Sequence, residues 1–195
     1  MESALLRNAA VTHLSELAQT ARMVSEQLLD EIVRVSSITY DCLTSGHKLM
    51  YCGNGGSAAD AQHIATEYVV RFRRNRAPLA AMALTTDTSL LTAASNDFSF
   101  DQVFERQVEA LGLPGDILFL HSTSGESENL LLAADAARSS DIITIALLAR
   151  GGGRLAARVD HKLVVPTDNG AHAQELHLAI SHIICDLVEQ RFVNA

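Results

Sequence analysis

The sequence predicts an α/β fold: a three-layer αβα sandwich around a five-stranded parallel sheet, preceded by N-terminal helices. The chain has 195 residues, of which 48% are hydrophobic and 19% charged, so it can bury one substantial core. After Gly46, short apolar runs alternate with turns and helical patterns, which is typical of βαβ units. Right-handed crossovers then bring the loops that follow the strands to one edge of the sheet, where such folds bind ligands.

Residues 4–44 carry apolar positions at helical spacing and predict one or two amphipathic helices before the first strand. An apolar stripe at this place must pack against the back of the sheet or against a partner subunit. The stripe consists of Leu14, Leu17, Ala18, Ala21, Val24, Leu28 and Ile32.

Five apolar runs then predict the strands, and a helical pattern follows each of the first four turns. A final helix is expected from about Ala171 to Val193. We expect the other helices to end near Phe72, Leu111 and Arg138, with a short helix after Gly151-Gly152-Gly153. The expected strands are residues 48–52, 79–84, 116–121, 142–148 and 162–165.

Composition restricts the class of protein. The net charge is −8, from 15 Lys and Arg against 23 Asp and Glu, which argues against a general nucleic-acid binder. No apolar run approaches the roughly 20 residues of a membrane span, and the first residues do not resemble a secretory signal. The three cysteines are widely spaced and form neither a disulfide pattern nor a CxxC zinc site. We therefore expect a soluble, cytoplasmic, single-domain protein that contacts neither nucleic acid nor membrane.

The loop after the first expected strand has the composition of an anion site. Residues 53–60 read Gly-Asn-Gly-Gly-Ser-Ala-Ala-Asp and open a helix. Glycines let backbone amides approach an anion, and the start of a helix adds free N–H donors and a positive dipole end. A strand–glycine–helix turn can also serve only to reverse the chain, so this loop alone does not show that an anion binds here.

A second loop repeats the arrangement. Residues 122–127 read Ser-Thr-Ser-Gly-Glu-Ser, with four hydroxyls at a strand-to-helix junction. Several hydroxyls together with helix-start amides suit a phosphate monoester, whereas simple helix capping needs only one. No GxxxxGK[ST] or GxGxxG motif occurs, which argues against a nucleotide-triphosphate loop.

Titratable residues recur on two of the expected helices. His63 and Glu67 stand four residues apart and share a helix face, which suits a metal pair, an acid/base pair or an ordinary surface ion pair. On the last helix, Gln174 and His182 lie near one face but about 12 Å apart along the axis, so they can share only a ligand lodged between them. The other histidines, His13, His47, His121 and His161, are expected to be ordinary core or surface residues.

Four arginines and three further polar residues are the remaining candidates for the site. We expect most of Arg71, Arg73, Arg74 and Arg76 to form a solvated helix end, with one or two reaching an anionic substrate. Asp87, Asn96 and Asp97 follow the second strand and are expected to help line the same edge of the sheet.

Together these motifs resemble the phosphoheptose isomerases of the sugar-isomerase (SIS) fold, a flavodoxin-like αβα sandwich. The resemblance rests on residues 53–63 (GNGGSAADAQH), Asn96-Asp97-Phe98, Ser122-Thr123-Ser124-Gly125 and Gln174-Glu175-Leu176-His177, which occur in the family's order. It covers nearly the whole chain and implies a single SIS domain over residues 1–195. Residues 1–45 would then be a helical oligomerisation segment and residues 46–195 the αβα core.

The resemblance implies interconversion of sedoheptulose 7-phosphate and D-glycero-D-manno-heptose 7-phosphate through an enediol, for surface-glycan precursors such as those of lipopolysaccharide. It also implies a homotetramer with active sites at subunit interfaces. Glu67 would be the catalytic base and His182 its acid/base partner. A zinc ion would be held by His63, Glu67, Gln174 and His182. The implied substrate and phosphate contacts are Asn54, Gly55, Gly56, Ser57, Arg71, Asn96, Asp97, Ser122, Thr123, Ser124, Ser127 and Gln174.

The sequence departs from the family pattern at three places and leaves other functions open. Glu126 replaces a common Asn and should turn away from a phosphate or cap the helix. His172 stands where an Arg is common, and residues 148–151 replace a Leu-Thr-Gly-type turn, which bears on substrate identity. One alternative is a non-catalytic tetramer, since a related SIS protein binds the replication initiator DnaA. The other is an isomerase or sensor for a different sugar phosphate.

Overall fold

The computed structural model describes residues 2–194, with the side chains of residues 3–193. Two helices come first, α1 (Glu2–Gln27) and α2 (Leu29–Thr44). Five strands follow, β1 (Leu49–Gly53), β2 (Ala81–Ala83), β3 (Ile117–Ser122), β4 (Ile143–Leu148) and β5 (His161–Val164). The remaining α-helices are α3 (Gly56–Val69), α4 (Thr88–Asp97), α5 (Glu105–Leu111), α6 (Glu128–Ser139) and α7 (Gly170–Asn194). Short 3-10 helices are η1 (Phe100–Gln102), η2 (Arg150–Gly152) and η3 (Arg154–Ala157).

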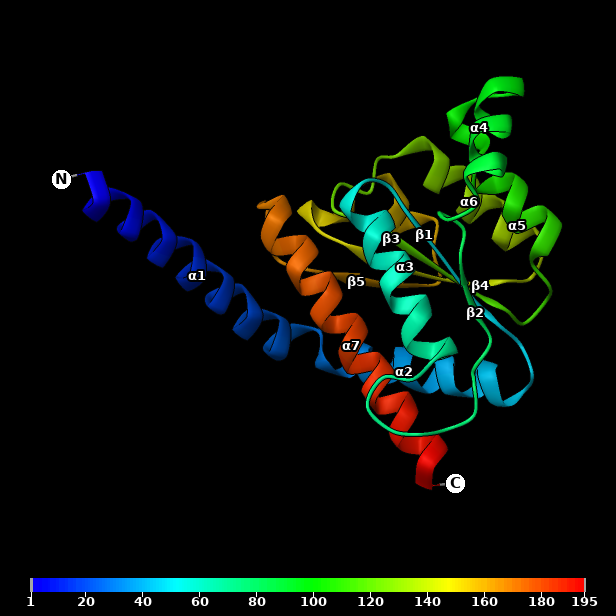
Figure 1. Cartoon of the computed structure of the whole chain (residues 1–195), viewed down its shortest axis with the longest axis horizontal. Coiled ribbons are helices and arrows are strands. Elements are labelled where there is room, and N and C mark those ends of the chain that lie inside the picture. Colours follow the sequence, from blue (N-terminus) through cyan, green and yellow to red (C-terminus); the bar gives the residue numbers. More distant parts are fainter. Residues whose placement is uncertain (1, 195) are drawn as a thin grey trace.

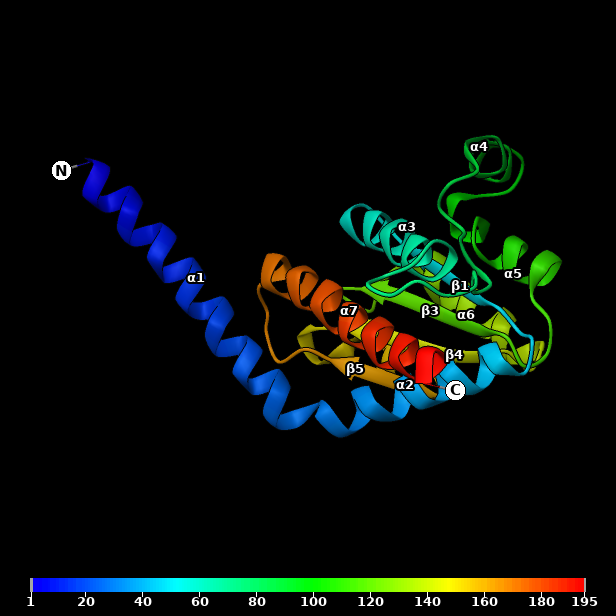
Figure 2. The same cartoon turned by 60° about the horizontal axis from the view of Figure 1, so that its bottom comes forward.

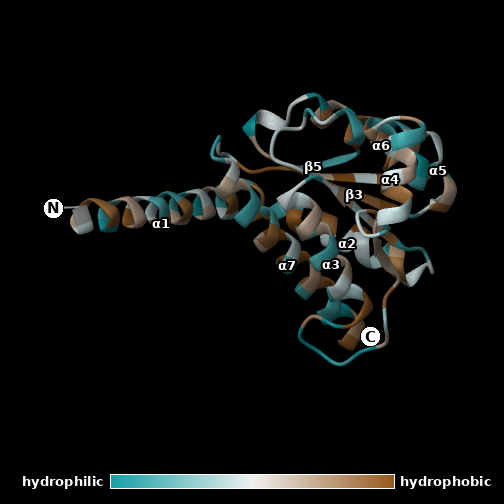
Figure 3. Ribbon diagram, turned by 45° about the horizontal axis from the view of Figure 1, so that its top comes forward, coloured by the Kyte–Doolittle hydropathy of each residue, from teal (hydrophilic) through white to brown (hydrophobic). Residues whose placement is uncertain are grey.

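The strands form one parallel sheet in the order β2-β1-β3-β4-β5. Every residue of β1 and β3 is buried, as expected for central strands covered on both faces. Figure 3 shows α2, α3 and α7 on one side of the sheet and α5 and α6 on the other. The predicted three-layer sandwich is therefore confirmed.

The first helix leaves the body of the protein. α1 extends as a long arm whose N-terminal half stands clear of the sheet and its helices (Figures 1 and 2). The predicted stripe packs only toward the end of the arm, where Val24 is buried and Leu17 is partly buried against the core. Leu14 is 65% exposed, and the large apolar side chains before it are exposed as well. These exposed apolar residues are Leu5, Leu6 and Val11.

One helical expectation is corrected by the structure. The helix predicted to reach Phe72 ends at Val69, because the backbone N–H groups of residues 72–74 bond to the Glu189 carboxylate instead of to helical carbonyls. The helical stretches expected between β2 and β3 are α4, η1 and α5, and the last ends at Leu111 as predicted; Asp87 caps α4 by accepting the Leu90 N–H. None of the helices within residues 2–194 combines the length and apolar character needed to cross a membrane.

Two buried histidines lie in the layer between the sheet and α7. His121 on β3 is fully buried, and neither of its ring nitrogens has a hydrogen-bond partner among the described residues. Its ring lies 6.4 Å from that of His177, whose Nε2 donates to the Leu148 carbonyl. Burial, with a smaller effect from His177, lowers the pKa of His121 from 6.5 to about 3.

We predict that His121→Leu makes the fold less sensitive to mild acid. Between pH 6.5 and about 3 the unfolded chain binds a proton at His121 that the folded chain refuses, so stability falls as the pH falls through this window. Urea unfolding at pH 7 and pH 5 should show a smaller loss in the variant than in the wild type. Phe119→Leu, also buried in β3, is the control and should leave the pH dependence unchanged; an equal pH dependence in all three proteins would contradict the prediction.

Candidate functional site

The chemically reactive residues meet where α3 and α7 pack side by side. His63 and Glu67 share a face of α3, and the His63 Nε2 atom lies 3.4 Å from Glu67 Oε1. His182 comes from α7, and its Nε2 atom lies 2.9 Å from Nε2 of His63. The structure thus brings three of the four predicted metal ligands together, with ligand atoms all within 4.8 Å of one another.

Burial changes the pKa of His182. Desolvation lowers the pKa of His182, and the neighbouring His63 lowers it further, against the opposing effect of Glu67. The ring is therefore held in its neutral form at neutral pH. A neutral imidazole beside a carboxylate can accept a proton, donate one or ligate a metal ion.

Gln174 lies elsewhere on the same helix. Its side chain packs against the first residue of α3, where a Cβ atom on Gly56 would lie 2.3 Å from the Gln174 amide oxygen. Asp60 lies nearby and is buried; desolvation raises the pKa of its carboxyl, and Gln174 opposes this shift. A side chain at residue 56 would therefore have to displace the Gln174 amide.

The first glycine loop has the geometry of a helix-start anion site. Gly55 adopts a positive φ of 55°, and the helix begins at the next residue. Ser57 is buried in the first turn. A Cβ atom on Gly53 would lie 2.7 Å from the Ser57 carbonyl oxygen, so the strand and the helix start approach too closely for any other residue.

The hydroxyl-rich loop is closed by its own side chains. The Ser122 hydroxyl accepts the Gly125 N–H at 2.9 Å, and the Ser124 hydroxyl accepts the Glu126 N–H at 3.2 Å. Thr123 is half-buried and Ser127 stands at the start of α6 without a side-chain capping bond. Glu126 turns outward as predicted: it pairs with Arg154 at 2.8 Å, and it does not cap the helix.

A pair of asparagines joins the two loops. The Asn54 and Asn129 amides exchange two hydrogen bonds, each 2.9 Å long. Asn54 follows β1, whereas Asn129 lies in the first turn of α6 and is buried. The Asn129 side chain was not among the predicted site residues; an amide on the apolar face of α6 was the only signal for it.

Two predicted substrate contacts lie apart from these groups. Asn96 and Asp97, at the end of α4, hydrogen-bond to each other, and Asp97 lines a groove with Phe98 and Arg106. The volume of this groove is about 330 Å³. Figures 1 and 2 show α4 at the far side of the molecule from α7. Within the described part of one chain, these two residues do not join the cluster of α3 and α7.

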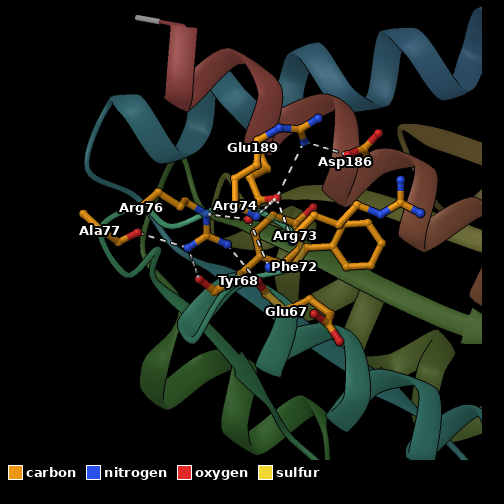
Figure 4. A network of polar contacts seen from close by, with 9 residues as sticks. All are labelled: Glu67, Tyr68, Phe72, Arg73, Arg74, Arg76, Ala77, Asp186 and Glu189. Carbon is orange, nitrogen blue, oxygen red and sulfur yellow. Dashed lines mark hydrogen bonds and ion pairs between the residues drawn. The ribbon is translucent and has the colours of Figure 1, made fainter.

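The arginines after α3 are bound in a network, contrary to the expected solvated helix end. The Glu189 carboxylate of α7 is buried and accepts the backbone N–H groups of Phe72, Arg73 and Arg74 at 2.8–3.0 Å (Figure 4). Arg76 lies 3.4 Å from it, with its side chain 6% exposed. Arg76 also donates to the Glu67 carbonyl, so it does complement the end of α3, but from a buried position. Of the four arginines, Arg71 and Arg73 remain exposed.

This network reaches the reactive cluster through an aromatic ring. The Phe72 ring stacks on His182 with a centroid distance of 5.2 Å and an interplanar angle of 19°. Burial alone would raise the pKa of Glu189, but the three backbone N–H donors and Arg76 outweigh it and lower the pKa. Glu189 and Phe72 were missed from the sequence because their partners lie more than 100 residues away along the chain.

Comparisons with known proteins place the chain in a family. The SIS domain model matches residues 12–149. The phosphoheptose isomerase of Nitratidesulfovibrio vulgaris strain Miyazaki F is 45% identical over 94% of this chain and 88% of its own length. The chain belongs to the phosphoheptose isomerase family of SIS-domain proteins. The family member from Akkermansia muciniphila is 48% identical over 82% of this chain and 85% of its own.

Solved structures of the family agree with this fold over nearly its whole length. Phosphoheptose isomerase GmhA from Neisseria gonorrhoeae superposes with a TM-score of 0.90 at 41% identity, covering 95% of this chain and 99% of that one. The phosphoheptose isomerase from Francisella tularensis gives a TM-score of 0.91 at 36% identity, covering 94% of this chain and 97% of that one. The similarity to these two structures therefore extends well beyond the sheet, over 94% or more of the chain.

We predict that Glu189→Gln lowers the free energy of unfolding by about 2 kcal/mol, because it removes the charge that satisfies a buried arginine and three backbone donors. Urea denaturation at fixed protein concentration measures the effect. Asp186→Asn is the control, since Asp186 pairs with Arg74 at the edge of the same network and its side chain is 23% exposed. Its effect should stay below about 1 kcal/mol. Equal losses in the two variants would contradict the central place of Glu189.

Proposed function

We propose that this protein is an aldose–ketose isomerase that interconverts sedoheptulose 7-phosphate and D-glycero-D-manno-heptose 7-phosphate. The observation that carries the proposal is the cluster of His63, Glu67 and His182 in a chain whose relatives are named phosphoheptose isomerase. The names of the relatives favour an enzyme over the alternative of a protein that only binds a partner. The product supplies heptose for surface-glycan precursors such as lipopolysaccharide.

The reaction moves one proton between neighbouring carbons. Glu67 removes a proton from the carbon next to the carbonyl group, and an enediol forms. The same carboxylic acid returns the proton to the other carbon. His182 takes the proton from the hydroxyl oxygen on one carbon and gives a proton to the carbonyl oxygen on the other. A neutral ring can do both, and burial of this histidine favours that form.

The donor set of the cluster also suits a metal ion. Two imidazole nitrogens and a carboxylate oxygen are ligands that zinc prefers, and the His63 and His182 nitrogens already face each other. We propose zinc bound by His63, Glu67 and His182, with Gln174 as the fourth ligand after its amide leaves Gly56. Zinc, when bound, would polarise the sugar carbonyl and stabilise negative charge on its oxygen.

The phosphate group would bind at the edge of the sheet where the two loops meet. Backbone amides of Gly55 and Gly56 and the hydroxyls of the two loops are the proposed donors, as in other helix-start anion sites. The start of α3, which follows the first loop, lies about 10 Å along the helix axis from His63, by its rise of 1.5 Å per residue. Such a separation favours a sugar whose phosphate and carbonyl lie at opposite ends. The proposed hydroxyl donors are Ser57, Ser122, Thr123, Ser124 and Ser127.

Asn54 and Arg71 are proposed as further substrate contacts in the same chain. Asn96 and Asp97 lie away from the cluster and would meet a substrate only across a subunit boundary. We therefore propose that the protein assembles as a homotetramer with active sites between subunits. The exposed apolar side chains of the α1 arm support this assembly. In this view, residues 1–45 are the oligomerisation segment of one SIS domain, and residues 46–195 are its core. We also propose that the enzyme works in the cytoplasm.

We predict that the purified protein converts sedoheptulose 7-phosphate to the aldose, and that five- and six-carbon sugar phosphates turn over at least about tenfold more slowly. Glu67→Gln and His182→Ala should each lower kcat by at least about 100-fold, as expected for loss of a general acid or base. Aldose formation is followed by chromatography of quenched samples. Glu128→Gln, an exposed residue of α6, is the control and should keep wild-type activity. Absence of turnover by a folded, zinc-supplied protein would overturn the proposed reaction.

We predict further that charge on the arm prevents assembly. Leu6→Glu together with Leu14→Glu places two carboxylates among side chains that are 64% and 65% exposed in one chain. Light scattering after size-exclusion chromatography should give a smaller assembly than the wild type. Leu113→Glu, on the body of the protein and 60% exposed, is the matched control. An unchanged mass for the arm variant would exclude this face from the interface.

A further inference from the structure

A second cluster of two histidines and a glutamate lies where the arm passes the start of α7. His13 comes from α1, and His172 and Glu175 come from the first turns of α7. The His13 Nδ1 atom lies 3.3 Å from Nε2 of His172, and the His13 Nε2 atom lies 3.7 Å from Glu175 Oε1. This cluster shares no residue with the one formed by His63, Glu67 and His182.

The orientation of His172 is fixed by its surroundings. The residue is 1% exposed, and Asn169 holds it from one side. The Asn169 side-chain oxygen accepts the backbone N–H groups of Ala171 and His172, which leaves its amide nitrogen 3.5 Å from His172 Nε2. Since that nitrogen can only donate, it faces an unprotonated Nε2 atom of His172, whose single lone pair is free to bind a metal ion once this long contact opens.

The same nitrogen also lies close to a second imidazole, that of His13. Two ring nitrogens cannot face each other at 3.3 Å unless a proton or a cation lies between them. The spacing equals the separation of about 3.3 Å expected between two nitrogen ligands of a tetrahedral ion with bonds near 2.05 Å. His13 and Glu175 are each 45% exposed, so water can complete the coordination.

The second cluster has nearly the same ligand spacing as the first. The cluster of α3 and α7 has the same composition, two histidines and one glutamate, with a nitrogen–nitrogen distance of 2.9 Å and a nitrogen–oxygen distance of 3.4 Å. The corresponding distances in the second cluster are 3.3 and 3.7 Å. His161 and Glu31, by contrast, form a simple pair with no second histidine.

We propose that His13, His172 and Glu175 form a second site for a divalent transition ion of the zinc class. Two imidazoles and a carboxylate suit such ions better than calcium or magnesium, which take oxygen ligands. The ion would link the arm to the first turns of α7 and so fix the direction in which α1 leaves the body. It would act in the fold and not in the reaction.

Zinc content per chain tests the proposal. The full-length protein, dialysed against buffered micromolar zinc, is analysed by mass spectrometry of the metal. We expect two ions per chain in the wild type and one in His13→Gln, with isomerase activity retained. Glu175→Gln, whose side chain is exposed, is the second variant and should weaken zinc binding at this site at least about tenfold. His161→Gln is the matched control and should keep both ions.

A variant that lacks the first cluster separates this proposal from the proposed catalytic metal. The double variant His63→Gln, His182→Gln should keep one ion per chain, and adding His13→Gln should remove it. Circular dichroism confirms that each protein is folded. A zinc content that is the same in the wild type, His13→Gln and Glu175→Gln would overturn the second site and show that a proton alone lies between His13 and His172.

Discussion

The contact between α3 and α7 governs the chemistry of this protein. It places the Nε2 atoms of His63 and His182 2.9 Å apart, with the Glu67 carboxylate beside them. Such an arrangement cannot persist with nothing between the nitrogens, because two lone pairs at that distance repel. A proton or a metal ion must be shared there, so the cluster is ready either for proton transfer or for metal binding before any substrate arrives.

The remainder of the fold maintains that contact. Glu189 on α7 binds the backbone that follows α3, so the two helices are joined beyond the last turn of α3. The loop held in this way carries Phe72, which stacks on His182 and covers one face of its ring. At the other end of the helices, the Gln174 amide fills the space left by Gly56. The anion-binding loops are linked separately through the paired amides of Asn54 and Asn129.

Sequence patterns predicted the layers of the fold and part of the site. The central strands were recognisable because strands buried on both faces are continuously apolar, and the pairing of His63 with Glu67 followed from their spacing on one helix. The approach of His182 needed the resemblance, since spacing alone does not say which helices pack together. Glu189 and Asn129 escaped notice because a buried polar residue is explained only by its partners. Likewise, the arginines after α3 were expected in solvent, whereas a carboxylate distant in sequence orders their backbone.

The central claim is that the carboxylate of this cluster moves a proton between two carbons of the substrate. It is tested most directly by running the isomerisation in deuterium oxide and locating deuterium in the aldose by nuclear magnetic resonance. A proton carried by Glu67 exchanges with solvent during the lifetime of the enediol, so deuterium should appear at C2 of the product. Complete retention of the substrate hydrogen, together with unimpaired turnover by Glu67→Gln, would indicate direct hydride transfer between the carbons and would contradict the account.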